Sequence, residues 1–263
     1  KNRVGKECAL RKAVNQASHE LICFTDVTTM MNANGIANMI NHFLEPNVGA
    51  VSSIDGIDEN NHWLEKILVK YENFLRIHGS VVSSCIGVSG SFFVTKKNIF
   101  KSIPKNCTSD FAIALECRKQ GLAVNWEQHS LGFYKKTRNL HIEFFRKTRT
   151  IAHGMNTLVQ YKELLNVFQY GLLSLQLYSH KILRWALPLL LLILFILFGI
   201  QIIAQLGVEY IFITGVVVAF FMLVKTSFLY NGALLFVYVA AISFAIYSLV
   251  VGNRWEIWEP TKR

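Results

Sequence analysis

Asp26 stands at a position where a carboxylate could take part in chemistry. It ends the apolar run ELICFTD, which is typical of a buried strand, and Thr28 and Thr29 follow it. A carboxylate at the carboxyl end of a strand lies where α/β folds bind ligands. Together with hydroxyls it can hold a divalent metal whose other ligands are substrate phosphates. An aspartate that only stabilises a turn or a helix start fits the pattern equally well, so both interpretations remain open.

Asp110 is the second candidate. It lies between a polar loop and an apolar helical segment in CTSDFAIALECRKQG. A carboxylate at this place could accept the proton of a reacting hydroxyl as a general base. A Ser-Asp pair before a helix is also the usual sequence of an N-cap, and spacing alone favours that simpler function.

Basic residues provide candidates for binding phosphate. Lys6 begins a helical pattern, where a cation and free backbone N–H groups could meet an anion. Arg146 and Arg149 lie in the basic segment EFFRKTR, which precedes the apolar part of the chain. Such a cluster could neutralise a diphosphate or bind lipid headgroups. It could equally be a solvated basic collar on the cytosolic side of a membrane.

The loop GVSGS contains Gly87, Ser89 and Gly90, whose small size would let a substrate approach the backbone closely. Any tight turn before a strand has a similar composition, so the signal is weak by itself. The eight histidines have no metal-ligand spacing. There is also no P-loop, nucleophile elbow or complete dinucleotide-binding fingerprint.

Strand-like and helix-like segments alternate in the part of the chain that carries these residues. Short apolar or β-branched runs predict strands, and apolar residues at helical spacing predict helices. The expected strands are 20–26, 48–54 and 121–127, and FFVTKKNIF (92–100) is expected to be a strand followed by the start of a short helix. The expected helices are 6–18, 34–44, 62–77, 110–119 and 139–165. The alternation predicts an α/β sheet, and the strand at 20–26, apolar on both faces, predicts parallel pairing.

The remainder of the chain has the composition of a membrane protein. Residues 1–178 hold 21 of the 27 lysines and arginines and 14 of the 17 acidic residues. Three apolar runs of bilayer length follow, at 186–206, 208–224 and 228–251. The basic residues before the first run place the soluble part on the cytosolic side. We therefore expect about three transmembrane helices.

The net charge of +10 limits the partners. It fits nucleic acid, anionic lipid or a phosphorylated substrate. The apolar runs favour the lipid bilayer and the phosphorylated substrate, and no zinc-finger spacing supports nucleic acid. None of the five cysteines forms a C-x-x-C pair, so no disulfide framework is expected and a reducing, cytosolic setting fits best. Protein partners are left open.

The order of these segments resembles the membrane-anchored family-2 glycosyltransferases, which include cellulose, chitin and hyaluronan synthases. RVGKECALRKAV is similar to the family segment R-x-G-K-x-x-A-L-N, with Arg11 in place of the Asn. ELICFTDVTTM resembles the metal- and nucleotide-binding strand that ends in Asp-x-Asp, with Asp26 at the first position and Thr28 at the second. EPNVGAVSS is similar to the strand that follows.

Further segments match in the same order over nearly the whole chain. YENFLR and GVSGSFFVTKKNIF resemble the acceptor-side segment and its small-residue loop, and TSDFAIALECRKQGLAVNWE resembles the block with the catalytic base. The basic motif before the membrane is matched by EFFRKTRTIAHG. The entry to the membrane bundle resembles SHKILRWALPLL, and the family's C-terminal tail resembles WEPTKR. Processive members have Gln-x-x-Arg-Trp, where this chain has Arg146, Arg149 and Thr150.

The resemblance implies an α/β GT-A fold, which is Rossmann-like and here incomplete at the N-terminus, followed by an α-helical transmembrane region. The first strands and much of the uridine pocket would lie in a missing N-terminal portion. The domains implied are a cytosolic GT-A portion (1–155), an amphipathic interfacial linker (156–185), about three transmembrane helices (186–252) and a tail (253–263).

The implied reaction is transfer of a sugar, with inversion, from a nucleotide-sugar of the UDP type to a polysaccharide or lipid-linked glycan at a bacterial-type inner or plasma membrane. In this scheme Asp110 is the base and Asp26 holds Mg²⁺ or Mn²⁺ on the donor. Lys6, Arg146 and Arg149 add positive charge at the diphosphate.

Two alternatives remain open. The first is transfer of one sugar to polyprenyl phosphate or another lipid. The second is a non-catalytic membrane scaffold related to glycosyltransferases, which the threonine at position 28 would favour.

Overall fold

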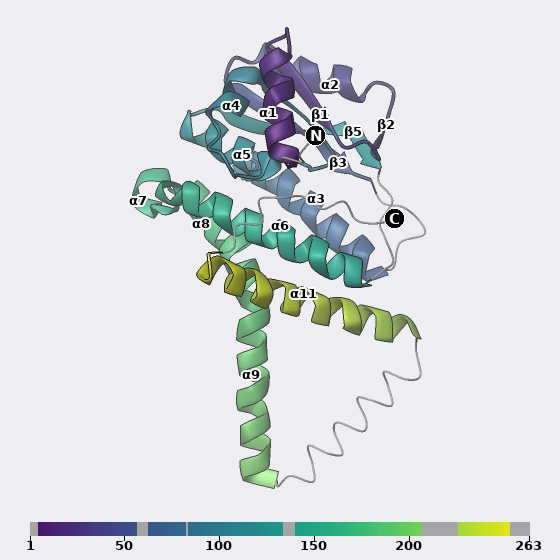
Figure 1. The fold of residues 1–263 in the computed structure, drawn as a ribbon, viewed down its shortest axis with the longest axis vertical. Helices are drawn as coiled ribbons and strands as arrows, with labels where there is room; N and C mark the ends of the chain where they lie inside the picture. The colour runs from purple at the N-terminus through teal and green to yellow at the C-terminus, as the bar shows by residue number, and fades with distance from the viewer. Residues whose placement is uncertain (1–4, 57–62, 83, 134–139, 207–225, 253–263) are drawn as a thin grey trace. The chain divides into compact units, whose positions relative to one another are not determined.

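The computed structural model describes residues 5–56, 63–82, 84–133, 140–206 and 226–252 (Figure 1). The chain divides into two compact units. The first comprises Lys1–Thr137, Ala152–Tyr178 and Arg254–Arg263, and the second comprises Arg138–Ile151 and Ser179–Asn253.

A five-stranded mixed sheet forms the centre of the first unit. Its strands are β1 (Leu21–Thr25), β2 (Met30–Met31), β3 (Val48–Asp55), β4 (Phe92–Lys96) and β5 (Ala123–Phe133). Their order in space is β1-β4-β3-β5-β2. The predicted mixture of helices with a sheet is confirmed. The pairing is mostly antiparallel, because β3 and β5 form the one parallel pair among these neighbouring strands.

The expectation of parallel pairing is wrong for β1. This strand runs antiparallel to β4, with Leu21 opposite Lys96 and Thr25 opposite Phe92. It is the first strand in the sheet order, and only Phe24 within it is buried. An apolar run shows that a segment prefers burial, but it carries no information about strand direction.

The apolar core lies where β3 and β4 pair. β3 contributes β-branched residues, and β4 contributes β-branched and aromatic residues, which pack well on a pleated surface. Six successive β3 residues, from Val48 to Ser53, are buried. One core cluster consists of Met39, Val48, Val51, Phe92 and Val94.

Helices cover this sheet. Those that precede β5 in the sequence are α1 (Lys6–Gln16), α2 (Gly35–Asn41), the short 3₁₀ helix η1 (His42–Leu44), α3 (Trp63–Val82), α4 (Lys97–Ser102) and α5 (Ser109–Lys119). Helix α5 packs on β3 and β5, and every residue from Phe111 to Cys117 is buried. A helix that is apolar on all sides is expected to be buried in this way. Its burial holds Asp110 at a fixed place beside the sheet.

Helix α3 continues five residues beyond its predicted end at residue 77. Gly79 lies inside the helix, and a Cβ there would come no closer than 3.7 Å to a neighbouring atom. Glycine costs about 1 kcal/mol in a helix relative to alanine, which the packing of a long amphipathic helix can offset.

The last part of the first unit closes on α5. It contains the end of α6 (Leu140–Gln160), the 3₁₀ helix η2 (Lys162–Leu165), α7 (Val167–Tyr170) and α8 (Leu172–Leu177). The hydroxyl of Tyr161 donates to Glu116 at 2.8 Å, and both side chains are buried. Gln120 donates to the other carboxylate oxygen of Glu116 at 2.7 Å, so both oxygens of this buried group have partners.

The second unit contains the first residues of α6, together with a π-helix (Tyr178–Ile182), α9 (Leu183–Leu206) and α11 (Thr226–Val250). The Lys147 ammonium lies 4.4 Å from the centre of the Tyr238 ring. Of the helices in the described residues, none is by itself both long and apolar enough for a membrane crossing. A pair bent by 42°, Leu172–Leu187 with Leu192–Gln201, meets that requirement. The predicted run at 208–224 lies outside the described residues.

Candidate functional site

The site begins at the start of α1. Gly5 precedes the helix with φ at +85°, a conformation that glycine adopts without the steric cost borne by other residues. The next residue, Lys6, donates from Nζ to Oδ1 of Asp26 at 2.8 Å. Each side chain is 49% exposed. An ion pair this exposed contributes at most about 1 kcal/mol, so a ligand could separate the two groups at little cost.

Asp26 forms a turn directly after β1. Its N–H donates to the carbonyl of Ser91 at 3.1 Å, and its own carbonyl accepts from the N–H of Thr29 at 2.9 Å. The backbone therefore makes the turn, and the carboxylate points to Lys6 and solvent. Thr28 is exposed, whereas the hydroxyl of Thr29 is buried without a hydrogen-bond partner among the described residues.

Asp110 is the second residue of α5 and is half-buried. Its Oδ1 accepts from the N–H of Phe111 at 2.9 Å. The explanation of Asp110 as an N-cap is wrong, because the N-cap residue is Thr108, whose side chain makes no capping bond. The Thr108 hydroxyl instead lies 3.2 Å from that of Thr157.

The first turn of α1 reaches the surroundings of both aspartates. Lys6 pairs with Asp26, and Oε1 of the next residue, Glu7, accepts from the N–H and the hydroxyl of Ser109 at 3.2 and 3.3 Å. Glu7 thus satisfies a free N–H at the start of α5 from outside the helix, where negative charge is favoured. Ser109 is adjacent to Asp110, so one helical turn connects the two candidate segments.

The loop from Gly87 to Ser91 borders both aspartates as well. The N–H of Val88 donates to the carbonyl of Asp110 at 3.0 Å, and the Ser91 carbonyl accepts from Asp26. A Cβ added to Gly90 would lie 3.3 Å from Oδ2 of Asp110. The structure therefore brings Asp26 and Asp110 to the two ends of one short loop, at the edge where β1 ends and β4 begins.

The three predicted loop residues differ in their surroundings. Gly90 is exposed and lies beside the Asp110 carboxylate. This is the place that the predicted approach of a substrate to the backbone requires. Gly87 has open space around it. Ser89 is fully buried, and its hydroxyl donates to Oδ1 of Asp55 at 2.5 Å. The Ser89 hydroxyl thus bonds to a buried carboxylate and does not face solvent.

Asp55 and Arg76, beneath this loop, were missed by the sequence reasoning. Arg76 donates to Oδ2 of Asp55 at 2.7 Å, and the two side chains are 17% and 12% exposed. Burial alone lowers the pKa of Arg76, but the carboxylates of Asp55 and Glu72 more than offset this and raise it above its usual value. The signal was available, because Asp55 ends the apolar run VGAVSSID just as Asp26 ends its own strand.

The donors around Asp26 fit a metal carried by a substrate better than a dedicated metal site. Within the described residues no group of three or more His, Cys, Asp or Glu side chains gathers. Mg²⁺ and its analogues are often held by one or two carboxylates together with substrate phosphates. The exposed carboxylate of Asp26 meets that minimal requirement.

Arg146 and Arg149 belong to the second unit, so their predicted contact with a diphosphate stays a prediction. Arg146 binds both carboxylate oxygens of Glu143, from Nε at 2.8 Å and from a terminal nitrogen at 2.6 Å. Burial, with the charge of Arg146, lowers the pKa of Arg149. Both guanidiniums thus have charged neighbours within α6.

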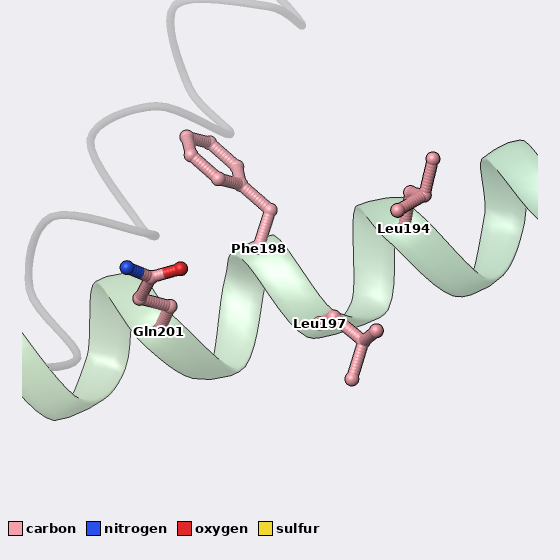
Figure 2. Close-up of a pocket in the computed structure, with 4 residues that line it drawn as sticks. All are labelled: Leu194, Leu197, Phe198 and Gln201. Atoms are coloured by element: carbon pink, nitrogen blue, oxygen red, sulfur yellow. The ribbon is translucent and has the colours of Figure 1, made fainter.

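A shallow hollow on α9 carries no candidate chemistry. Figure 2 shows its four lining side chains, which all project from this one helix: Leu194, Leu197, Phe198 and Gln201. None of the four is titratable.

The Glu7 carboxyl yields a prediction for the pH dependence of stability. Burial raises its pKa, the charge of Asp110 adds to the rise, and the bonds from Ser109 only partly oppose it. Because the pKa of Glu7 is higher in the folded than in the unfolded protein, the folded state favours the protonated carboxyl. This contribution to stability is complete below about pH 4.5 and is lost as the pH rises through the folded-state pKa. Glu7→Gln, which can still accept from Ser109, should therefore gain stability over the parent as pH rises from 4 to 7.

The measurement is the thermal unfolding midpoint of the Glu7→Gln variant and the parent at several pH values. Glu45→Gln removes an exposed carboxylate and should show no such trend. A constant difference between Glu7→Gln and the parent across this range would contradict the prediction.

Comparison with known proteins gives a distant structural likeness. No family model matches the sequence, and no curated protein matches it. Two solved structures of glucosyl-3-phosphoglycerate synthase from Mycobacterium tuberculosis are similar. The structure with Mn²⁺, UDP-glucose and phosphoglyceric acid has a TM-score of 0.44 and 14% identity, covering 60% of this chain and 56% of that one. The structure with Mn²⁺, UDP and glucosyl-3-phosphoglycerate has a TM-score of 0.42 and 11% identity, covering 60% and 55%.

The chain therefore spans a little over half the length of these synthase structures. A likeness this distant assigns no role to any residue. The roles of Asp26, Asp110 and their neighbours are drawn from the contacts described above.

Proposed function

We propose that this chain is part of a membrane-bound glycosyltransferase. It would transfer a sugar, with inversion, from a nucleotide-sugar of the UDP type to a hydroxyl of a glycan or lipid-linked acceptor. The observation that carries this proposal is the convergence of Asp26 and Asp110 on the two ends of the loop from Gly87 to Ser91. The order of the sequence motifs supports it independently.

On the donor side, the exposed end of β1 would bind the diphosphate. Lys6 would leave Asp26 and pair with a phosphate oxygen, which exchanges one exposed ion pair for another. Asp26 would hold Mg²⁺ or Mn²⁺, which when bound would neutralise charge on the leaving diphosphate. An electrostatic contact of this kind is worth roughly 3 kcal/mol of transition-state stabilisation.

On the acceptor side, Asp110 would take the proton of the attacking hydroxyl. The acceptor oxygen then bonds to the anomeric carbon, and the bond from that carbon to the diphosphate oxygen breaks, leaving its electron pair on the nucleoside diphosphate. Gly90 allows the acceptor to come close, because it has no side chain beside Oδ2 of Asp110. An attack from the face opposite the leaving group inverts the anomeric centre.

A donor screen tests the proposal. The natural full-length protein in detergent is incubated with individual nucleotide-sugars, Mn²⁺ and membrane lipids, and nucleotide release is measured. Release from one or a few donors is expected. The size of the radiolabelled product then separates chain growth from transfer of one sugar to a lipid. Absence of release from every donor would favour a non-catalytic scaffold.

The donor site gives a prediction for Asp26→Ala. In Mn²⁺, the affinity for the nucleotide-sugar should fall by about tenfold, because a charged contact to the bound donor is lost. Without metal, variant and parent should bind almost equally. The check is titration calorimetry with and without Mn²⁺. An affinity that is the same for both proteins under both conditions would remove Asp26 from metal binding.

The loop gives a prediction for Gly90→Ala. Gly90 does not need a positive φ, so alanine is compatible with its backbone. Its methyl group would press on Oδ2 of Asp110 at 3.3 Å. Displacing a reacting group by a few tenths of an ångström should lower turnover by about tenfold. The matched control is Gly87→Ala, whose methyl group would meet no atom within 4 Å. Equal turnover in the two variants would contradict the prediction.

A further inference from the structure

The loop that borders both aspartates rests on a buried polar network. Asp55, the last residue of β3, accepts from Arg76 at Oδ2 and from two hydroxyls at Oδ1. The hydroxyl donors are Ser89 at 2.5 Å and Ser91 at 3.0 Å. One carboxylate thus connects a helix and a strand end to two residues of the loop.

Helix α3 holds this carboxylate in place through a second residue. Asn73 donates to the carbonyl of Asp55 at 2.9 Å and accepts from its N–H at 3.3 Å. Arg76, one turn further along α3, holds the side chain of Asp55. Both the backbone and the side chain of Asp55 are therefore fixed from one helix.

The loop is bound by its own backbone as well. The N–H of Ser89 donates to the hydroxyl of Ser52 at 2.8 Å, and that of Ser91 donates to the hydroxyl of Ser89 at 3.2 Å. These bonds hold the underside of the loop, while Val88 bonds to the carbonyl of Asp110. The exposed Gly90 is left between anchored neighbours.

A purely stabilising role explains this network poorly. Buried ion pairs recover little more than the cost of removing their charges from water, and well-packed apolar residues often stabilise a core equally well. A charge-assisted network does provide directional bonds that hold a chain in one geometry. The loop has few side chains of its own to fix Gly90 beside Asp110, so its geometry depends on anchors from below.

We infer that Asp55, held by Arg76, is a positioning residue that fixes the loop from Gly87 to Ser91 between Asp26 and Asp110. The inference rests on the proposed function and extends it to groups that do not touch the substrate. Removing the serine hydroxyls should leave donor binding unchanged, since Asp26 bonds to the loop through the Ser91 carbonyl and not through those hydroxyls. It should lower turnover, because Gly90 and Asp110 would no longer be held in one arrangement.

The test uses Ser89→Ala/Ser91→Ala, which removes both hydroxyl donors and leaves the Asp55–Arg76 pair intact. The matched control is Ser53→Ala. Ser53 is equally buried in the same sheet, and its hydroxyl donates to the carbonyl of Phe92. Hydrogen exchange of the Val88 and Ser89 amides, whose acceptors both variants keep, is measured together with donor affinity and turnover.

In the double variant we expect exchange of these amides to be at least about tenfold faster than in the control. Turnover should fall by about tenfold while donor affinity matches the control. Unchanged exchange would overturn the positioning role, as would faster exchange with normal turnover. If the parent protein transfers no sugar, the proposed function fails, and amide exchange alone then decides whether Asp55 holds the loop.

Discussion

Asp110→Asn should fold normally and transfer sugar at least about 100-fold more slowly than the parent. Asparagine has almost the same shape, and its side-chain oxygen can still accept from the N–H of Phe111, so the start of α5 should keep its structure. It cannot accept the proton of the attacking hydroxyl. The loss should therefore appear in turnover, with donor affinity close to that of the parent.

Steady-state rates with a saturating donor, compared with donor affinity from calorimetry, separate these two effects. Glu20→Gln serves as the control, because it replaces an exposed carboxylate outside the site. Sugar transfer by Asp110→Asn at nearly the parent rate would exclude Asp110 as the base. The proposed mechanism would then lack a proton acceptor.

Arg76→Met should lower the free energy of unfolding by about 3–5 kcal/mol. Methionine can fill most of the volume of the arginine side chain, but it leaves the Asp55 carboxylate buried without its cation. The two serine hydroxyls still donate to Asp55 and cannot neutralise its charge. Denaturant unfolding of the detergent-solubilised protein measures the loss.

A second substitution tests the physical cause. Asp55→Asn in the Arg76→Met background removes the uncompensated charge and should recover at least about 2 kcal/mol. Lys70→Met on the same helix controls for loss of one exposed cation. If Arg76→Met were as stable as Lys70→Met, the buried pair would have no structural importance, and the inference about Asp55 would weaken with it.

Much of the fold around Asp26 and Asp110 could be predicted because local pattern determines it. The segments that contain them are a short apolar run and an all-apolar helix, and both signals depend on neighbours in the sequence. The placement of Asp26 at the end of a strand followed from the polarity change at ELICFTD. The proximity of the two aspartates rested on motif order, and the contacts of the loop now give it a geometric basis.

The network beneath the loop could not be predicted in the same way. Asp55, Arg76 and Ser89 come from separate elements, and no short-range periodicity connects them. The direction of β1 was missed for a related reason, since strand pairing is decided by the whole chain rather than by the strand. Local preference predicted a cap from the Ser-Asp pair at the start of α5, yet Glu7 supplies the bond to Ser109 from a position about a hundred residues away in the sequence.

The first turn of α1 has a consequence for attempts to redesign this protein. Lys6 and Glu7 are adjacent in the sequence, yet one contacts the proposed donor side and the other supports the proposed acceptor side. Residues that share a rigid element usually show energetic coupling when they are changed together. Epistasis is therefore to be expected between substitutions aimed at sugar choice and those aimed at acceptor choice, and libraries that vary the two separately would miss the productive combinations.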